Sequence, residues 1–285
     1  MRKWILIPIL LLGLLMIVGL ILFVIYADNT TLQLTTYQIS HQQIPAEFDG
    51  FRIAQVSDLH NTEFGEDNAS LLSLLSESNP DIIVFTGDQL DSRNPDKDVV
   101  LSFVRQAVQI APCYLVTGNH EGSLPDMREF LNQLEDAGVT VLDNEACELT
   151  RNEATIDLIG LTDASMHKLF YSHGPEVSLE TALEEIAPKQ EHYSILLAHN
   201  PSYLYLYERN GIDLALCGHN HGGQIRIKDQ GLISADKEIL PEYDGGVYTL
   251  GDATMVLSRG LGNSLFPWRV NNPPELVIVE LKTKA

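Results

Sequence analysis

Apolar residues form one long run at the start of the 285-residue chain and many short runs after it. The long run, residues 4–26, contains no charged residue. At about 1.5 Å per residue it can cross a bilayer core of roughly 30 Å. A cleaved signal would have an apolar core of about 7–15 residues and a small-residue cleavage site, and the sequence after Tyr26 offers a poor one. We therefore expect an uncleaved, single-pass membrane anchor, although a removed signal would give the same compartment.

Basic residues set the expected orientation of this anchor. Arg2 and Lys3 precede the apolar run and Asp28 follows it. The positive-inside rule then keeps the N-terminus in the cytoplasm. We expect the rest of the chain to lie outside the cytoplasm, attached to the cell membrane.

The short runs predict an α/β fold. Apolar residues alternate with polar ones in 30–43 and predict a first strand. Five further strand-like runs follow, at 52–56, 81–85, 113–116, 194–197 and 212–217. Segments with helical character lie between the strands, at 68–78, 96–109, 125–137, 178–187 and 201–209. After Gly211 only short strands are predicted, at 224–227, 247–250, 255–258 and 276–281, and we expect a second sheet to be built from this C-terminal third.

The length after the anchor suits one large domain. About 240 residues follow the first strand, and no repeat or shift in composition divides them. We expect residues 1–28 to form the cytoplasmic N-terminus and the anchor, 29–50 a connecting segment with the initial strand, and 51–285 one domain.

Charge and cysteine content exclude some classes of protein. The net charge of −21 argues against a nucleic-acid partner held by general electrostatics. The cysteines Cys113, Cys147 and Cys217 are odd in number and widely spaced, so no disulfide framework is expected. Cys113 and Cys217 lie in predicted strands, where a thiol packs as a small apolar group. No Gly-x-Ser-x-Gly motif is present, which disfavours a serine hydrolase.

Side chains that can bind metal ions follow five of the predicted strands. They are Asp58 and His60, Asp88, Asn119, His199, and the pair His219 and His221. The His-x-His pair alone would fit a polar loop as well as a metal site. Ligands of open α/β sheets bind beyond the carboxyl ends of the strands, so we expect all of these side chains to meet at one edge. Mixed histidine, carboxylate and amide donors suit Mn²⁺, Fe or Zn²⁺ better than Mg²⁺ or Ca²⁺.

The motifs in this order resemble the calcineurin-like metallophosphoesterase family. The matching blocks are Asp58-Leu59-His60, Gly87-Asp88-Gln89-Leu90-Asp91, Gly118-Asn119-His120-Glu121, His199 and Gly218-His219-Asn220-His221. Glu121 stands where many members have aspartate, at a position that is not a ligand in the family. The anchor, together with the segments 258–262 and 273–275, resembles the membrane-associated bacterial branch, which is similar to UDP-2,3-diacylglucosamine hydrolase. The resemblance implies a four-layer α/β/β/α sandwich of two mixed sheets behind the transmembrane helix.

The resemblance also implies two divalent metal ions bridged by Asp88. The first would be held by Asp58, His60, Asp88 and His221, and the second by Asp88, Asn119, His199 and His219. A hydroxide shared by ions about 3.5–4 Å apart would attack phosphorus in line with the leaving oxygen. The implied activity is hydrolysis of a phosphodiester or pyrophosphate. A phosphomonoesterase, or a membrane-tethered metal-binding protein without turnover, is the alternative.

Four further residues are candidates for supporting roles. The resemblance implies that His120 faces the substrate, where an imidazolium could stabilise phosphoryl charge or protonate the leaving alkoxide; a histidine that only orients other groups is the alternative. Asp91 could bond a ligand histidine or cap a helix. Arg259 and Arg269 could grip a phosphate, or could be surface arginines.

The expected anchor makes a lipid-linked or nucleotide-sugar lipid substrate attractive, and a substrate of the cell-wall space fits equally. Segments 167–175 and 266–268 are apolar enough to contact a lipid chain, or to be ordinary loops. The sequence indicates neither the oligomeric state nor which metals are bound.

Overall fold

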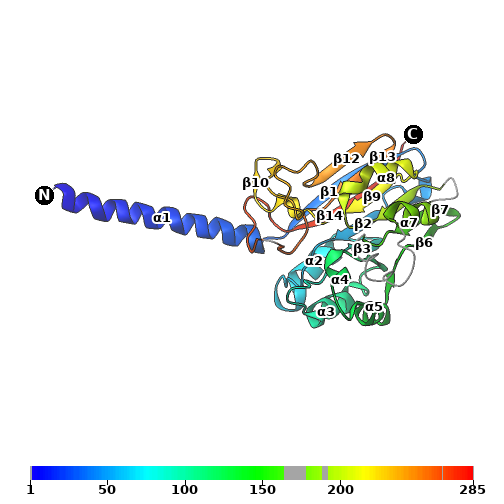
Figure 1. Ribbon diagram of the computed structural model, residues 1–285, viewed down its shortest axis with the longest axis horizontal. Coiled ribbons are helices and arrows are strands. Elements are labelled where there is room, and N and C mark those ends of the chain that lie inside the picture. The colour runs from blue at the N-terminus through cyan, green and yellow to red at the C-terminus, as the bar shows by residue number, and fades with distance from the viewer. Residues whose placement is uncertain (1, 164–177, 188–191, 265, 285) are drawn as a thin grey trace.

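Two six-stranded sheets form the centre of the molecule (Figure 1). The computed structural model describes residues 2–163, 178–187, 192–264 and 266–284. The first sheet has the order β1-β14-β2-β3-β4-β5. Its strands are β1 (Gln33–His41), β14 (Glu275–Thr283), β2 (Arg52–Val56), β3 (Ile82–Thr86), β4 (Cys113–Val116) and β5 (Val139–Val141). β14 is parallel to β1 and antiparallel to β2, and β2 to β5 are all parallel.

The second sheet has the order β12-β13-β9-β8-β7-β6. Its strands are β12 (Gly246–Leu250), β13 (Ala253–Leu257), β9 (Leu214–Cys217), β8 (Ser194–Leu197), β7 (Ala154–Gly160) and β6 (Glu145–Arg151). The four central strands are parallel, and each edge strand is antiparallel to its neighbour. A small hairpin of β10 (Arg226–Ile227) and β11 (Gln230–Gly231) lies apart from both sheets.

Helices cover the outer face of each sheet. The helices packed on the first sheet are α2 (Ala69–Glu77), α3 (Lys97–Ala107) and α5 (Met127–Asp136), while α7 (Leu179–Ile186) and α8 (Leu204–Arg209) pack on the second. Short helical turns occupy loops: α4 (Asn119–Gly122), η1 (Ala46–Phe48), η2 (Glu66–Asn68), η3 (Pro201–Tyr203) and η4 (His221–Gly223).

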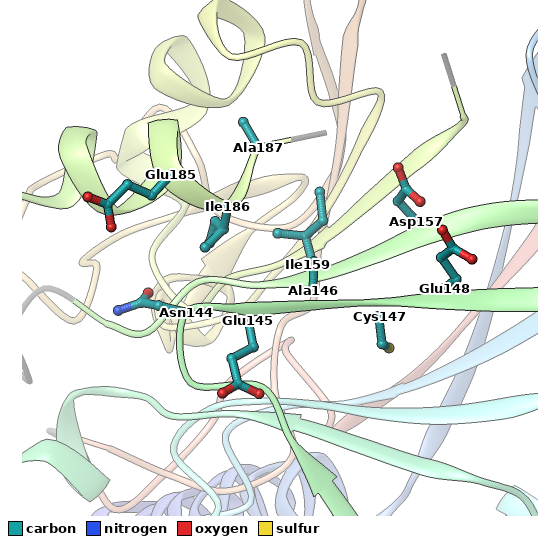
Figure 2. A pocket seen from close by; sticks show the side chains of 10 residues that line it. All are labelled: Asn144, Glu145, Ala146, Cys147, Glu148, Asp157, Ile159, Glu185, Ile186 and Ala187. Atoms are coloured by element: carbon teal, nitrogen blue, oxygen red, sulfur yellow. The ribbon is translucent and has the colours of Figure 1, made fainter. Parts of the chain in front are cut away.

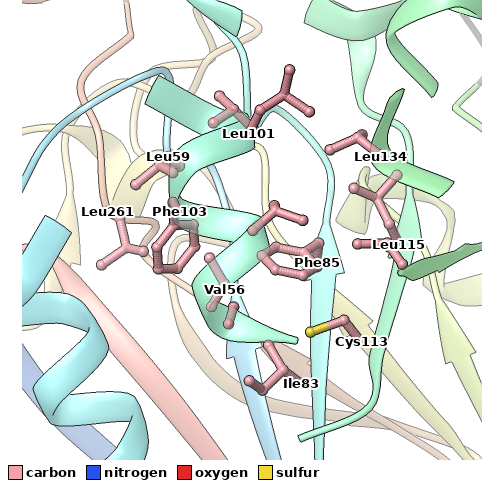
Figure 3. Close-up of a cluster of buried hydrophobic side chains, with 14 of the residues drawn as sticks. Val56, Leu59, Ile83, Phe85, Leu101, Phe103, Cys113, Leu115, Leu134 and Leu261 are labelled. Carbon is pink, nitrogen blue, oxygen red and sulfur yellow. The ribbon is translucent and has the colours of Figure 1, made fainter. Parts of the chain in front are cut away.

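Three apolar cores hold the layers together. The first lies between α2, α3, α5 and the first sheet, where Phe85 of β3 meets Phe103 of α3 edge to face (Figure 3). The second lies between the two sheets and includes Val84 and Leu197. The third lies between the second sheet and α7 and α8. Burying such side chains contributes about 1.5–3 kcal/mol each. The four-layer α/β/β/α sandwich is therefore confirmed.

The chain starts with α1 (Arg2–Thr30), which projects from the domain as a single exposed apolar helix (Figure 1). Residues 9–30 contain an 18-residue stretch with a mean hydropathy of 3.1, and the helix is long and apolar enough to cross a membrane. The apolar helix expected at the N-terminus is thus present.

Most predicted elements are found close to their expected positions, and two expectations are corrected. The second sheet is not built from the C-terminal third alone, because β6 to β8 supply half of it. The last strand, β14, belongs to the first sheet, where β1 and β2 flank it. The sequence pattern also missed three strands that follow α5: β5, at the edge of the first sheet, and the antiparallel pair β6 and β7 at the edge of the second. The segment 167–175, expected as a lip or loop, lies outside the described residues.

Candidate metal centre

The loops after five strands bring the predicted ligands together, and they do so with unusual backbone geometry. The residues with positive φ among the predicted ligands are Asp58 (52°), His60 (48°), Asp88 (53°), His219 (76°) and His221 (48°). Few residues other than glycine adopt this left-handed conformation, and such outliers gather at functional sites. Each turn aims its side chain back over the end of the strand.

One group of ligand atoms comes from Asp58, His60 and His221, all buried. The Nε2 atoms of His60 and His221 are 3.1 Å apart. The Nε2 atom of His221 lies 3.3 Å from Oδ1 of Asp58. Asp88 Oδ2 is 3.7 Å from the same His60 nitrogen. The four residues predicted for the first metal therefore meet at one point.

A second group comes from Asp88, His199 and His219. The Nε2 atom of His199 is 3.2 Å from Asp88 Oδ2 and 3.2 Å from Nδ1 of His219. Because Oδ2 of Asp88 also approaches His60, this carboxylate lies between the two groups. Asn119 comes from the turn after β4, and its buried Oδ1 has no hydrogen-bond partner among the described residues.

The chemistry of these atoms fits metal ions. Burial lowers the pKa of His60 to about 3 and also lowers the pKa of His221, so both imidazoles are neutral and each has one nitrogen lone pair free. Two neutral imidazoles whose Nε2 atoms adjoin, next to a buried amide oxygen, form a set of donors that suits a shared cation. Burial opposes charge on His199 and Asp88 as well, but their mutual attraction raises the pKa of the imidazole and lowers that of the carboxyl.

Two backbone carbonyl groups and one carboxylate, none of them a predicted ligand, fix the orientation of three of the histidines. His199 Nδ1 lies 2.8 Å from the carbonyl oxygen of Thr86, and His221 Nδ1 lies 3.2 Å from that of Gly262. A proton on each of these nitrogens leaves Nε2 free to bind a metal. The carboxylate of Asp236 lies 3.2 Å from His219 Nε2, which leaves Nδ1 of that ring facing His199.

The chain belongs to the calcineurin-like phosphoesterase family. The family profile, described as "Calcineurin-like phosphoesterase", matches residues 51–223, which contain both groups of ligands. Family membership makes the chain a metallophosphoesterase and implies divalent metal ions.

Relatives with curated names match over most of the chain. "Uncharacterized metallophosphoesterase YkuE" of Bacillus subtilis is 29% identical over 90% of this chain and 88% of its own length. "Phosphodiesterase YaeI" of Escherichia coli is 29% identical over 81% of this chain and 82% of its own. "Transmembrane protein with metallophosphoesterase domain" of Danio rerio is 30% identical over 86% of this chain and 56% of its own.

Glycines in the phosphoesterase site allow the backbone to approach the ligands closely. A Cβ atom at Gly118 would lie 2.3 Å from Oδ1 of Asp88, and one at Gly218 would lie 2.4 Å from Oδ2 of Asp58. No side chain fits at such distances, so both positions need glycine.

Glu121 holds two of the strand ends together, a role that the sequence pattern did not reveal. Its carboxylate accepts backbone N–H groups of Asp88 (2.8 Å), Gly118 (2.9 Å) and Leu90 (3.0 Å). Burial, and then the nearby Asp88 carboxylate, raises the pKa of Glu121 to about 7. A glutamate three residues after the glycine of a tight turn was the only available signal.

His120 lies at the edge of the site, half-buried beside the ligand His60, with ring centroids 4.5 Å apart. Its Nδ1 accepts the backbone N–H of Ser92 at 3.0 Å and lies 3.3 Å from the Asp91 carboxylate. Asp91 is therefore next to the predicted catalytic histidine, and Arg93, which the sequence analysis did not single out, holds it with a 2.8 Å ion pair.

The two predicted phosphate-binding arginines both make contacts within the protein. Arg259 forms a 2.8 Å ion pair with Glu275. Arg269 is 0% exposed, and its guanidinium donates to the carbonyl oxygens of Gly262 and Arg259. Neither contact tests a role in substrate binding, which stays a prediction.

A cavity of about 470 Å³ lies outside the metal centre, between β6, β7 and α7 (Figure 2). None of the predicted ligands lines it. Its walls carry the carboxylates of Glu145, Glu148, Asp157 and Glu185, which would repel a phosphate ester. The metal centre, and not this cavity, is the candidate site for phosphoester chemistry.

Proposed function

We propose that this chain is a dinuclear, metal-dependent phosphodiesterase that hydrolyses a phosphodiester or pyrophosphate bond at a membrane. The observation that carries the proposal is the meeting of two groups of ligand atoms at the Asp88 carboxylate. Two bound Mn, Fe or Zn ions would supply Lewis acidity to the phosphoryl oxygens and lower the pKa of a bound water.

The protein's own residues orient these ions and the substrate. Asp58, His60 and His221 would hold one ion, Asn119, His199 and His219 the other, with Asp88 shared between them. The rigid strand ends fix these donors before any ion binds, so little binding energy is lost in ordering them.

His120 is proposed as the group that handles the leaving oxygen. The Ser92 N–H donates to Nδ1 of the His120 ring, so the proton of a neutral ring resides on Nε2. From that atom it can be donated to a phosphoryl oxygen or to the leaving alkoxide. The Asp91 carboxylate lies 3.3 Å from the same Nδ1 atom. Such a donor suits any phosphate ester whose leaving alkoxide needs a proton, and the similarity to the relative named as a phosphodiesterase is the reason we favour a diester.

α1 is proposed to anchor the enzyme in the cell membrane, with residues 29–50 joining it to the catalytic domain, 51–285. The length and hydropathy of α1 support this proposal. Arg2 and Lys3 favour a cytoplasmic N-terminus and an extracytoplasmic domain. An alkaline phosphatase reporter fused to the C-terminus tests the side of the membrane, since an inactive fusion would reverse the assignment.

Substrates similar to those of UDP-2,3-diacylglucosamine hydrolase, the membrane-associated branch to which the sequence was likened, are the first natural compounds to assay. They join a nucleotide to a lipid through a pyrophosphate, which a site of this kind could cleave.

The decisive experiment uses the full chain in detergent micelles, freed of metal and then reloaded with Mn²⁺. Bis-p-nitrophenyl phosphate and p-nitrophenyl phosphate are assayed side by side. We expect metal-dependent diester hydrolysis, lost in Asp88→Asn and reduced about 10²–10⁴-fold in His120→Ala. His192→Ala is the matched control, because His192 pairs with Asp157 outside the metal centre.

Faster monoester than diester hydrolysis would overturn the phosphodiesterase assignment. A wild-type protein that binds metal yet hydrolyses neither compound nor a lipid pyrophosphate would favour the metal-binding protein without turnover.

A further inference from the structure

Several large apolar side chains are exposed on loops beside the end of α1. We call them the apolar rim. Its members, with their exposed fractions, are Ile227 (60%), Ile239 (77%), Leu240 (57%), Phe266 (41%) and Trp268 (60%). Single exposed apolar residues are ordinary, but several on adjoining loops mark a surface that meets another apolar phase.

Backbone hydrogen bonds join the loops of the apolar rim into one structure. The N–H of Arg226 donates to the carbonyl of Val270 at 2.9 Å. Leu232 donates to Ile225, and Leu240 donates to Leu232, both also at 2.9 Å. The two loops, 224–240 and 263–272, therefore present their apolar side chains from a common support.

The last turn of α1 is bonded to this same support. Oδ1 of Asn29 accepts the N–H of Arg269 at 3.0 Å and the side chain of Asn263 at 3.1 Å, while Nδ2 of Asn29 donates to the Arg269 carbonyl at 3.1 Å. The carboxylate of Asp28 accepts the N–H of Asn271 at 2.6 Å. Figure 1 shows the hairpin of β10 beside the end of the helix. The rim therefore lies at the level where the apolar helix ends.

Strand direction places the metal centre on the same side of the domain. β1 starts at Gln33, just after α1 ends at Thr30. β14 is parallel to β1 and β2 is antiparallel to β14, so the carboxyl end of β2 points back toward α1. Asp58 follows that end. The strands β3 and β4, parallel to β2, bring Asp88 and Asn119 to the same edge.

We propose that the apolar rim lies in the headgroup region of the bilayer and that the metal centre acts on a phosphodiester or pyrophosphate carried by a membrane lipid. The proposal rests on the proposed function and names its substrate class. Tryptophan and aliphatic side chains are favoured at membrane interfaces. Because α1 tethers the domain, the rim meets the surface at a high effective concentration and needs little affinity of its own. A water-soluble substrate would not require an apolar border around the site.

Tryptophan fluorescence tests the position of the rim, because the chain has two tryptophans, Trp4 and Trp268. The full-length Trp4→Phe variant leaves Trp268 as the sole fluorophore. It is reconstituted in phosphatidylcholine vesicles that contain phosphatidylglycerol, with or without lipids brominated near the headgroup. We expect Trp268 emission to be quenched by the brominated lipid and shielded from aqueous acrylamide.

A control places the sole tryptophan at the opposite end of the domain. Leu250 is 42% exposed at the turn between β12 and β13. Since β13 is parallel to β9 and β9 ends at the site, this turn lies at the far edge of the second sheet. A variant with Trp4→Phe, Trp268→Phe and Leu250→Trp should be quenched by acrylamide and not by brominated lipid. Equal behaviour of the two variants, or a Trp268 that only acrylamide quenches, would overturn the proposed membrane contact. Shielding of Trp268 from acrylamide in micelles, without quenching by brominated lipid, would instead indicate a second copy of the chain on the rim.

Kinetics separate this inference from the proposed function. The variant Ile227→Asp with Ile239→Asp should lower hydrolysis of a vesicle-borne lipid pyrophosphate by about tenfold or more, since charged side chains are disfavoured at the interface. Its hydrolysis of bis-p-nitrophenyl phosphate should stay within about twofold of wild type. Equal activity of variant and wild type on vesicles would overturn the lipid-substrate proposal. A wild-type protein that hydrolyses neither the soluble diester nor the lipid pyrophosphate would refute the proposed function, whatever the fluorescence shows.

Discussion

Replacing Arg269 by methionine is expected to weaken both the fold and metal binding, because its guanidinium supports the carbonyl that orients a ligand. The side chain is fully buried, and burial lowers its pKa to about 10, so it is a cation at neutral pH. Nε and Nη2 both donate to the Gly262 oxygen, and Nη1 donates to the Arg259 oxygen at 2.9 Å. The Gly262 oxygen in turn lies 3.2 Å from Nδ1 of His221.

The size of the effect follows from these contacts. Methionine fills part of the guanidinium volume but donates no hydrogen bond. A buried carbonyl that loses its partner costs about 1–3 kcal/mol. With two carbonyls affected, we expect a loss of about 2–4 kcal/mol in the free energy of unfolding, out of a typical total of about 5–15 kcal/mol. Loss of support for the His221 orientation should lower metal affinity by about 10–100-fold.

The assay combines urea unfolding, metal competition against a chelating indicator, and diester kinetics. Arg259→Met is the matched control. Its guanidinium pairs with Glu275 and, within the described part of the chain, contacts no ligand histidine, so stability should fall while metal affinity is kept. If Arg269→Lys raises KM while kcat and metal affinity stay at wild-type values, this reasoning is refuted. The guanidinium would then contact substrate, as the sequence suggested.

Two further changes probe the packing of the site and of the cores. Gly118→Ala should displace the Asp88 carboxylate, which the new Cβ would approach to 2.3 Å, and lower diester turnover by about 10²-fold. The control Gly19→Ala lies in the helix α1 and has open space around its Cβ, and equal losses in both would contradict the steric argument. Native protein should react with a thiol reagent only at the half-buried Cys147, because burial raises the pKa of Cys113 to about 12 and also raises the pKa of Cys217. The number of labelled thiols is measured by absorbance, and labelling of more than one thiol before unfolding would contradict this packing.

The candidate ligands could be predicted because their signals are local. A short apolar strand followed by a glycine turn and an aspartate or histidine places that side chain at a strand end, whichever sheet the strand joins. The candidate ligands lie together at one edge, as expected, even though β2, β3 and β4 belong to the first sheet and β8 and β9 to the second. The two sheets face each other, so their strand ends share one border.

Long-range contacts could not be predicted from the sequence. β14 pairs with β1 and β2, more than 200 positions earlier in the chain, and its apolar pattern suits either sheet. Arg269 looks like a surface residue until Gly262 and Arg259 fold around it. Asp236 likewise meets His219, and Glu121 meets Asp88 and Leu90, only when separate loops come together.

The electrostatics of the site connect its stability with its chemistry. A chain with a net charge of −21 buries the carboxylates of Asp58, Asp88 and Glu121 within one small region. Burial raises the pKa of both Asp58 and Glu121, because an ionised carboxylate loses its hydration there unless a cation is close by. Two divalent cations would supply four positive charges, and would then attract a phosphodiester to an otherwise acidic protein. The same ions would therefore stabilise the strained loops that hold them and select an anionic substrate.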